Sequence, residues 1–162
     1  MRSTVRSGVK LGAVSLLALA CTAAVAQNAP ATPEQKAAQA VELRRSVFKL
    51  IGYSFDPVGA MLKRQRPFDA ALVQKSAARL ELLAPLVEET FETDTRQFKL
   101  ETKARDGIWT NKSDFVAKNN DFIKAVAALS EAAKSGDQKA FTQAAASVGK
   151  ACGACHDSFR DK

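Results

Sequence analysis

Apolar side chains recur every three or four residues along the first long pattern in the chain, from Pro33 to about Gln65. This spacing predicts a helix with one buried face. Thr32, Pro33 and Gln35 fit a helix start, because threonine caps helices, proline suits the first helical position and Gln35 completes a capping box. Pro57 is expected to kink or interrupt the helix, since it has no backbone N–H. The predicted inward positions are Ala40, Val41, Val47, Phe48, Ile51, Phe55, Val58 and Leu62.

Three more helices are predicted after this one, each with a recognisable start. Asp69, Ser113 and Asp137 have short polar side chains that cap helices, and each precedes an apolar period. Pro85 is expected to kink or end the second helix, and Ser135-Gly136 to end the third. The inward positions are Leu72, Ser76, Leu80 and Leu83 in the second, Phe115, Phe122, Val126 and Leu129 in the third, and Phe141, Ala145, Val148, Cys152, Cys155 and Phe159 in the last.

The stretch from Glu92 to Asn111 is polar, lacks a sustained period and carries Trp109 near its end. We expect it to be the longest connection. Strand signals are absent, because Thr, Val and Ile do not cluster and no Asn-Gly or Asp-Gly turn separates alternating runs. The predicted fold is therefore all-α, an antiparallel four-helix bundle.

The first 26 residues have the pattern of an export signal. Arg2, Arg6 and Lys10 precede an apolar run over residues 11–20, and the small residues Ala24-Val25-Ala26 follow. This order is typical of a secretory signal peptide, here cleaved before Gln27. The apolar run is too short to span a bilayer, which takes about 20 residues. We therefore predict a periplasmic protein with one domain over residues 27–162 and no membrane span.

Cys21 leaves a second interpretation open, since it could be the lipidated first residue of a lipoprotein. The Ala-Val-Ala cleavage site is better formed, so we prefer it. Net charge also limits the partners. The chain has a formal net charge of +7, and removal of the three basic signal residues leaves +4. That is too mild to indicate nucleic-acid binding.

Cys152-Gly153-Ala154-Cys155-His156 is a C-x-x-C-H sequence, the attachment signature of c-type haem. On a helix the two thiols face the same way and can each bond a haem vinyl group, while His156 ligates iron. Both cysteines fall on the predicted inward face of the last helix. We predict one covalently attached haem c near the C-terminus, with His156 as the metal ligand.

Two other interpretations of this motif carry less weight. A redox-active dithiol normally stands in a βαβ setting, which the pattern lacks. A zinc site needs further Cys or His ligands, whereas His156 is the only histidine. No other imidazole is therefore available for the sixth coordination position of iron. Met61, the one methionine of the mature chain, is interpreted as a core or interface residue, so we predict five-coordinate iron.

The C-terminal segment 152–160 continues from the motif into Asp157-Ser158-Phe159-Arg160. Three weaker segments stand earlier, Val41-Glu42-Leu43-Arg44, Pro67-Phe68-Asp69-Ala70-Ala71 and Ile108-Trp109. In this order and spacing, over nearly all of the mature chain, the sequence resembles the cytochrome c′ family, the class II c-type cytochromes. The resemblance implies a four-helix bundle with haem near the C-terminus.

The resemblance also implies roles for five side chains. Phe48 falls where the family places the residue that covers the vacant face of the haem, a place taken by methionine in low-spin relatives. Arg44 resembles the arginine that hydrogen-bonds a haem propionate, and Arg160 the arginine beside the proximal histidine. Trp109 either shields a haem edge or simply packs. Asn120 aligns with a polar haem contact.

By resemblance, the expected function is binding of nitric oxide and carbon monoxide, for protection against nitric oxide or gas transport, with electron transfer as a further role. In the family, nitric oxide enters on the side of Phe48 and ends bound on the side of Arg160. Neither Phe48 nor Ile51 offers a hydrogen-bond donor, so stable oxygen carriage is not expected. The alternative is a low-spin electron carrier with Met61 or another group as sixth ligand.

An enzyme is not predicted, because the sequence offers no second histidine and no acid–base pair near the predicted distal face. The redox partner is unknown. Class II proteins often pair through their first two helices, and we expect Val58 and Met61 to contribute to such a homodimer.

Overall fold

Four long helices account for most of the computed structural model, which describes residues 30–162. They are α1 (Pro33–Leu62), α2 (Ala70–Leu83), α5 (Lys112–Ser135) and α6 (Gln138–Phe159), with the short helices α3 (Leu86–Glu89) and α4 (Gly107–Thr110) between α2 and α5. The described part contains no strand, only an isolated bridge between Ala104 and Arg160. The predicted all-α four-helix bundle is therefore confirmed. The signal peptide, its boundary at Gln27 and Cys21 lie outside the described residues.

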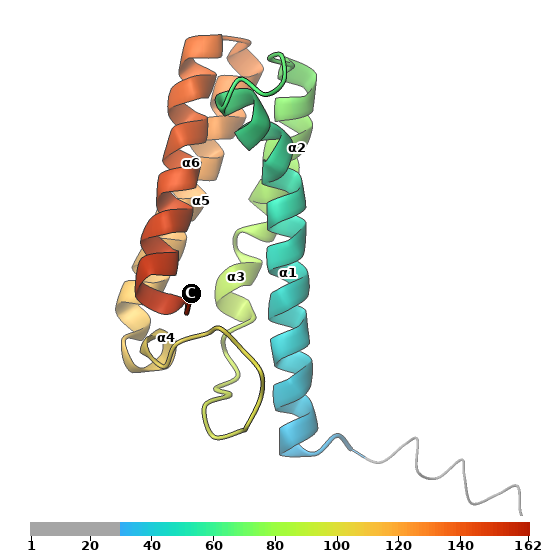
Figure 1. Ribbon diagram of the computed structural model, residues 1–162, viewed down its shortest axis with the longest axis vertical. Helices are drawn as coiled ribbons and strands as arrows, with labels where there is room; N and C mark the ends of the chain where they lie inside the picture. Colours follow the sequence, from blue (N-terminus) through green and yellow to red (C-terminus); the bar gives the residue numbers. More distant parts are fainter. Residues whose placement is uncertain (1–29) are drawn as a thin grey trace, which may run out of the picture. The chain divides into compact units, whose positions relative to one another are not determined.

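Residues 33–162 form one unit in which each long helix has two long neighbours. α5 packs against α2 and α6, while α1 packs mainly against α2 and meets α6 less extensively. α3 contacts α1, and α4 contacts α6, at the end of the bundle where α6 finishes (Figure 1). The weaker contact between α1 and α6 leaves room between them for a cavity.

The core follows the predicted stripes with one shift along α1. Its fully buried side chains include Leu80, Leu129 and Phe141. On α1 the buried stripe runs Ala37, Val41, Arg44, Val47, Ile51, Ser54, Val58 and Met61. Phe48, also predicted inward, is 40% exposed and lines a cavity between the helices instead of packing in the core. The stripe includes Arg44 and Ser54, which polarity alone had placed outside it.

The predicted helix boundaries at Asp69, Gly136 and Asp137 are confirmed. Asp69 accepts a hydrogen bond from the backbone N–H of Leu72 at 3.0 Å, and Asp137 accepts one from Lys139 at 2.7 Å. Gly136 ends α5 in the left-handed region, with φ 69°, where a side chain would strain the backbone.

Two start and stop predictions need correction. α5 begins at Lys112, so Ser113 lies inside it, and the Ser113 hydroxyl donates to Asn111 Oδ1 at 3.4 Å instead of capping the backbone. α1 is not interrupted at Pro57, so that half of the prediction is wrong, because the buried side chains on either side, Ser54 and Val58, keep the helix packed where one hydrogen bond is lost. Pro85 does separate α2 from α3.

The prediction that Val58 and Met61 form part of a dimer contact is wrong. Val58 is fully buried and Met61 is 6% exposed, so both belong to the core of the bundle. The large apolar side chains that the structure leaves exposed on these helices are Leu43, Phe48, Leu50 and Tyr53 on α1 and Leu82 on α2.

Candidate haem site

A cavity of about 800 Å³ is lined by α1, α5, α6 and the segments between α2 and α5. Its volume lies in the range of roughly 300–1,000 Å³ that cofactor pockets occupy. Aromatic rings form much of its wall, since Phe115 packs edge-on against Phe91 at 5.1 Å and against Phe159 at 5.4 Å between ring centroids. Such a wall suits a large, flat, apolar cofactor.

The C-x-x-C-H residues line this cavity from the last turns of α6. The inward stripe of α6 carries Phe141, Val148 and Phe159 into the core, and Cys152 and Cys155 lie half-buried on the same side. Burial raises the pKa of both thiols. A redox-active dithiol has the opposite shift, because its thiolate must form readily. The site therefore fits cysteines used for attachment.

His156 lies beside the cysteines in the cavity lining. Burial lowers the pKa of its imidazole, the charge of Arg160 lowers it further, and Asp157 opposes both. A lower pKa favours the neutral imidazole, which is the form that ligates iron. No group of three Cys, His, Asp or Glu side chains that could hold a bare metal ion occurs among residues 30–162. That observation counts against the zinc interpretation.

The residues present fit a haem. The cavity has the required size, the two thiols and the imidazole converge on it, and its walls are largely apolar. One buried polar atom in the lining, Asn119 Oδ1, accepts no hydrogen bond within the described part of the protein. Cys152 and Cys155 would hold the haem, and His156 would ligate its iron.

Phe48, Ile51 and Phe55 line the cavity from α1. The ring of Phe48 packs edge-on against Phe91, with 6.3 Å between centroids. Met61 does not line the cavity. It lies 13 residues beyond Phe48, about 20 Å further along the helix at 1.5 Å per residue, and is buried in the core. Met61 is therefore in the wrong place to be a sixth ligand.

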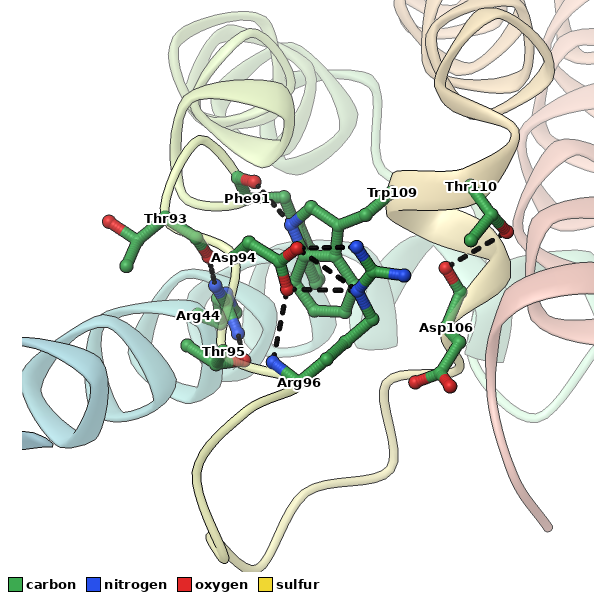
Figure 2. A network of polar contacts seen from close by, with 9 residues as sticks. All are labelled: Arg44, Phe91, Thr93, Asp94, Thr95, Arg96, Asp106, Trp109 and Thr110. Carbon is green, nitrogen blue, oxygen red and sulfur yellow. Dashed lines mark hydrogen bonds and ion pairs between the residues drawn. The ribbon is translucent and has the colours of Figure 1, made fainter.

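Arg44 is buried at the edge of the cavity and holds the connection that follows α3 (Figure 2). Its Nε donates to the carbonyl of Thr90 at 2.7 Å, one terminal nitrogen donates to Thr95 Oγ1 at 2.9 Å, and the other donates to the carbonyl of Thr93. The guanidinium carbon lies 4.6 Å from the centroid of Phe91. Three of its five N–H groups are used in these bonds.

Trp109 lies behind this network and outside the cavity lining. Its indole N–H donates to the carbonyl of Phe91 at 3.0 Å, and its ring stacks beside the guanidinium of Arg44, 5.2 Å away. Arg96, paired with Asp94 at 2.6 Å, also lies over the ring, with its guanidinium carbon 5.9 Å from the centroid (Figure 2). These contacts match the packing interpretation of Trp109 better than a direct haem contact.

Of the two other predicted haem contacts, Arg160 lines the cavity and Asn120 does not. Arg160 lines the cavity, is exposed and follows directly on α6, where its backbone N–H donates to the carbonyl of His156 at 3.1 Å. Asn120 is exposed and does not line the cavity, whereas its neighbour Asn119 does. The inward stripe of α5 runs through Phe115 and Phe122, and a four-residue step from Phe115 reaches position 119. That spacing was the signal that could have identified Asn119.

Comparison with known proteins agrees with this site. The family described as Cytochrome C' matches residues 39–160. The chain is 34% identical to cytochrome c′ from Rubrivivax gelatinosus over 128 residues, which cover 79% of this chain and 98% of the relative.

Two solved structures show the same likeness. One, titled cytochrome c prime from Shewanella frigidimarina, superposes with a TM-score of 0.73 at 40% identity and covers 78% of this chain and 97% of that one. The other is the nitric oxide complex of cytochrome c prime from Alcaligenes xylosoxidans in which one leucine is replaced by alanine. It superposes with a TM-score of 0.70 at 32% identity and covers 83% of this chain and 99% of that one. The chain thus belongs to the cytochrome c′ family, the class II c-type cytochromes, and binds covalently attached haem c.

Proposed function

We propose that this protein binds nitric oxide and carbon monoxide at a five-coordinate haem in the periplasm. The observation that carries the proposal is the composition of the cavity lining, which contains one imidazole, that of His156, and no methionine. When bound, the haem would supply an iron whose coordination sphere has room for a gas molecule. The chain's own residues decide which molecules reach it.

The apolar side chains that α1 contributes to the lining favour small uncharged ligands. Phe48, Ile51 and Phe55 offer no hydrogen-bond donor. Bound dioxygen carries partial negative charge and needs such a donor, whereas nitric oxide and carbon monoxide do not. The nitric oxide complex of the relative from Alcaligenes xylosoxidans supports the proposal by similarity.

Protection against nitric oxide, or its transport, is the physiological role that we propose. The family's route would bring nitric oxide in on the side of Phe48 and leave it bound on the side of Arg160. Both residues line the same cavity, which supports that route. No catalytic turnover is part of the proposal, and electron transfer is considered below.

Replacing Phe48 tests the function directly. Phe48→Ala should speed carbon monoxide association with the ferrous protein roughly five- to tenfold, because moving an aromatic side chain aside costs about 1 kcal/mol in the parent. The matched control is Ser46→Ala, at an exposed position of α1 that does not line the cavity. Flash photolysis measures both rates, and an unchanged rate in Phe48→Ala would remove Phe48 from the ligand path.

Export is the second part of the proposal. No helix among residues 30–162 has the length and apolarity needed to cross a membrane. We propose cleavage before Gln27, and the intact mass of protein from the periplasmic fraction tests it. A mass equal to residues 27–162 plus one haem is expected, while a lipid attached to Cys21 would overturn it.

A homodimer is proposed as well. The exposed apolar side chains Leu43, Leu50 and Tyr53 on α1, with Leu82 on α2, support pairing through these two helices. Sedimentation equilibrium of the haem-loaded protein should give twice the monomer mass, and replacement of Tyr53 and Leu82 by serine should halve it.

A further inference from the structure

Basic side chains are concentrated around the cavity. Six lysines and arginines line it against one acidic residue: Arg44, Arg45, Lys49, Lys103, Lys118 and Arg160 against Glu101. The chain has 24 basic and 17 acidic residues, and three of the basic ones precede Gln27. Subtracting both groups of basic residues, and Glu101, leaves 15 basic and 16 acidic residues elsewhere in 27–162. The net positive charge of the mature sequence therefore resides at the cavity.

We call five of these residues the basic rim: Arg45, Lys49, Lys103, Lys118 and Arg160. Two of them have partners, since Arg45 pairs with Glu42 at 2.7 Å and Lys118 lies 3.9 Å from Asp114. The other three, Lys49, Lys103 and Arg160, are exposed and form no ion pair with any residue in the described part of the chain. Their charges are available to a partner.

The haem itself would not neutralise the positive charge of the lining. Its two propionates would offset two of the five net positive charges in the lining, and three would remain. A cluster of one sign beside a low-dielectric cavity focuses its field outward and speeds the approach of anions. The rim residues come from α1, the 92–106 connection, α5 and the end of α6. This spread over four elements suits a broad acidic surface better than one small anion.

We propose that the basic rim docks the acidic surface of a redox protein that exchanges one electron with the haem. The inference rests on the proposed haem site and adds the kind of partner. In the reducing direction, one electron leaves the reduced centre of the partner, and the ferric haem iron takes it up and becomes ferrous. No proton or ligand needs to move in this step. Charge at the rim would control how fast the two proteins meet.

Stopped-flow reduction of the ferric haem-loaded protein tests the proposal. The probe is a reduced plant-type [2Fe–2S] ferredoxin, an acidic protein whose low potential makes electron transfer to the haem favourable. The second-order rate constant should fall about tenfold or more as salt rises from about 20 to about 500 mM, because exposed charges are then screened. The double variant Lys49→Gln, Lys103→Gln should lower the low-salt rate about fivefold and flatten its salt dependence.

A control variant of equal net charge separates the rim from overall charge. Lys75→Gln with Lys139→Gln removes two exposed lysines that lie outside the cavity lining, and its rate should stay within twofold of the parent. The proposal would be overturned if both double variants lowered the rate constant equally, or if the rate constant of the parent did not depend on salt. Oxidation of the ferrous protein by hexacyanoferrate(III), a small anion, gives a further test. If the rim variant slowed this oxidation but not reduction by ferredoxin, the proposal would also be overturned, since the rim would then guide small anions only.

Carbon monoxide binding, measured on the same samples, distinguishes failure of the docking proposal from failure of the proposed gas-binding function. A parent that binds carbon monoxide but shows no rim effect would contradict only the docking surface. A parent with the rim effect but no response to carbon monoxide would contradict only the proposed gas-binding function.

Discussion

Arg44 shows how one side chain can join the haem cavity to the rest of the bundle. It lies on the buried stripe of α1, yet it carries a charge, and burial lowers the pKa of its guanidinium while Asp94 counteracts the shift. The charge is compensated by two carbonyl groups, one hydroxyl and the faces of two aromatic rings. Removing the guanidinium would leave buried carbonyls unsatisfied, which is more costly than losing a surface contact.

Arg44→Leu should therefore lower the free energy of unfolding by about 2–3 kcal/mol, as measured by guanidinium denaturation of the haem-loaded protein. Its neighbour provides the control. Arg45→Leu removes an exposed arginine that pairs with Glu42 and donates to the carbonyl of Glu101, and exposed contacts of this kind contribute at most about 1 kcal/mol each. If both variants lost a similar amount of free energy of unfolding, the hydrogen-bond network around Arg44 would not be a special source of stability.

Residue roles were the least predictable part of the site. The motif identified Cys152, Cys155 and His156, because their chemistry depends on sequence spacing alone. Asn119 and the threonines that bind Arg44 could not be identified in that way, since the latter lie 46 to 51 positions away from it in the chain. Only the folded bundle brings them together.

Helix ends were predictable where a local rule decides them. Asp69, Gly136 and Asp137 act within their own turns, so the sequence was sufficient. The continuity of α1 through Pro57 and the start of α5 were not predictable, because packing against other helices outweighs the local preference there. The short helix α4 was missed for a related reason. Four residues have no period, and α4 is held by its contacts with α5 and α6.

Two glycines should respond in opposite directions to the same substitution. Gly136→Ala should destabilise the protein by about 1 kcal/mol, since alanine is strained at φ 69°. Gly149→Ala should stabilise it by up to about 1 kcal/mol, because Gly149 lies inside α6 and an added Cβ would meet no atom within 4 Å. Thermal unfolding of both variants tests this: a higher midpoint for Gly136→Ala would show that α5 does not end as described, and a lower midpoint for Gly149→Ala would contradict the open space beside α6.

At the scale of the whole bundle, the cavity depends on unequal helix contacts. α5 holds α2 and α6 together, while α1 and α6 stay apart enough to leave about 800 Å³ between their side chains. The fold class followed from four amphipathic periods, but the cavity did not, since no periodicity tells how closely two helices approach. Filling it with haem should stabilise the folded state, as any ligand does that binds only that state.

Removing both attachment points tests this coupling. Cys152→Ser with Cys155→Ser should lose its haem on a denaturing gel stained for haem, and its thermal midpoint should fall, because the cofactor is no longer held in place. Ser147→Ala, at an exposed position of α6, serves as the control. Haem that stays with the double variant through denaturation would show that it is attached elsewhere.

The visible spectrum of the haem-loaded protein tests the central claim most directly, in the ferric and dithionite-reduced states, before and after addition of carbon monoxide and nitric oxide. A cavity with one imidazole and no methionine predicts a broad, unsplit high-spin ferrous spectrum that changes at once with either gas. A sharp low-spin α-band that does not respond to gas would contradict the account, because some other group would then occupy the sixth position and an electron carrier would be the better description.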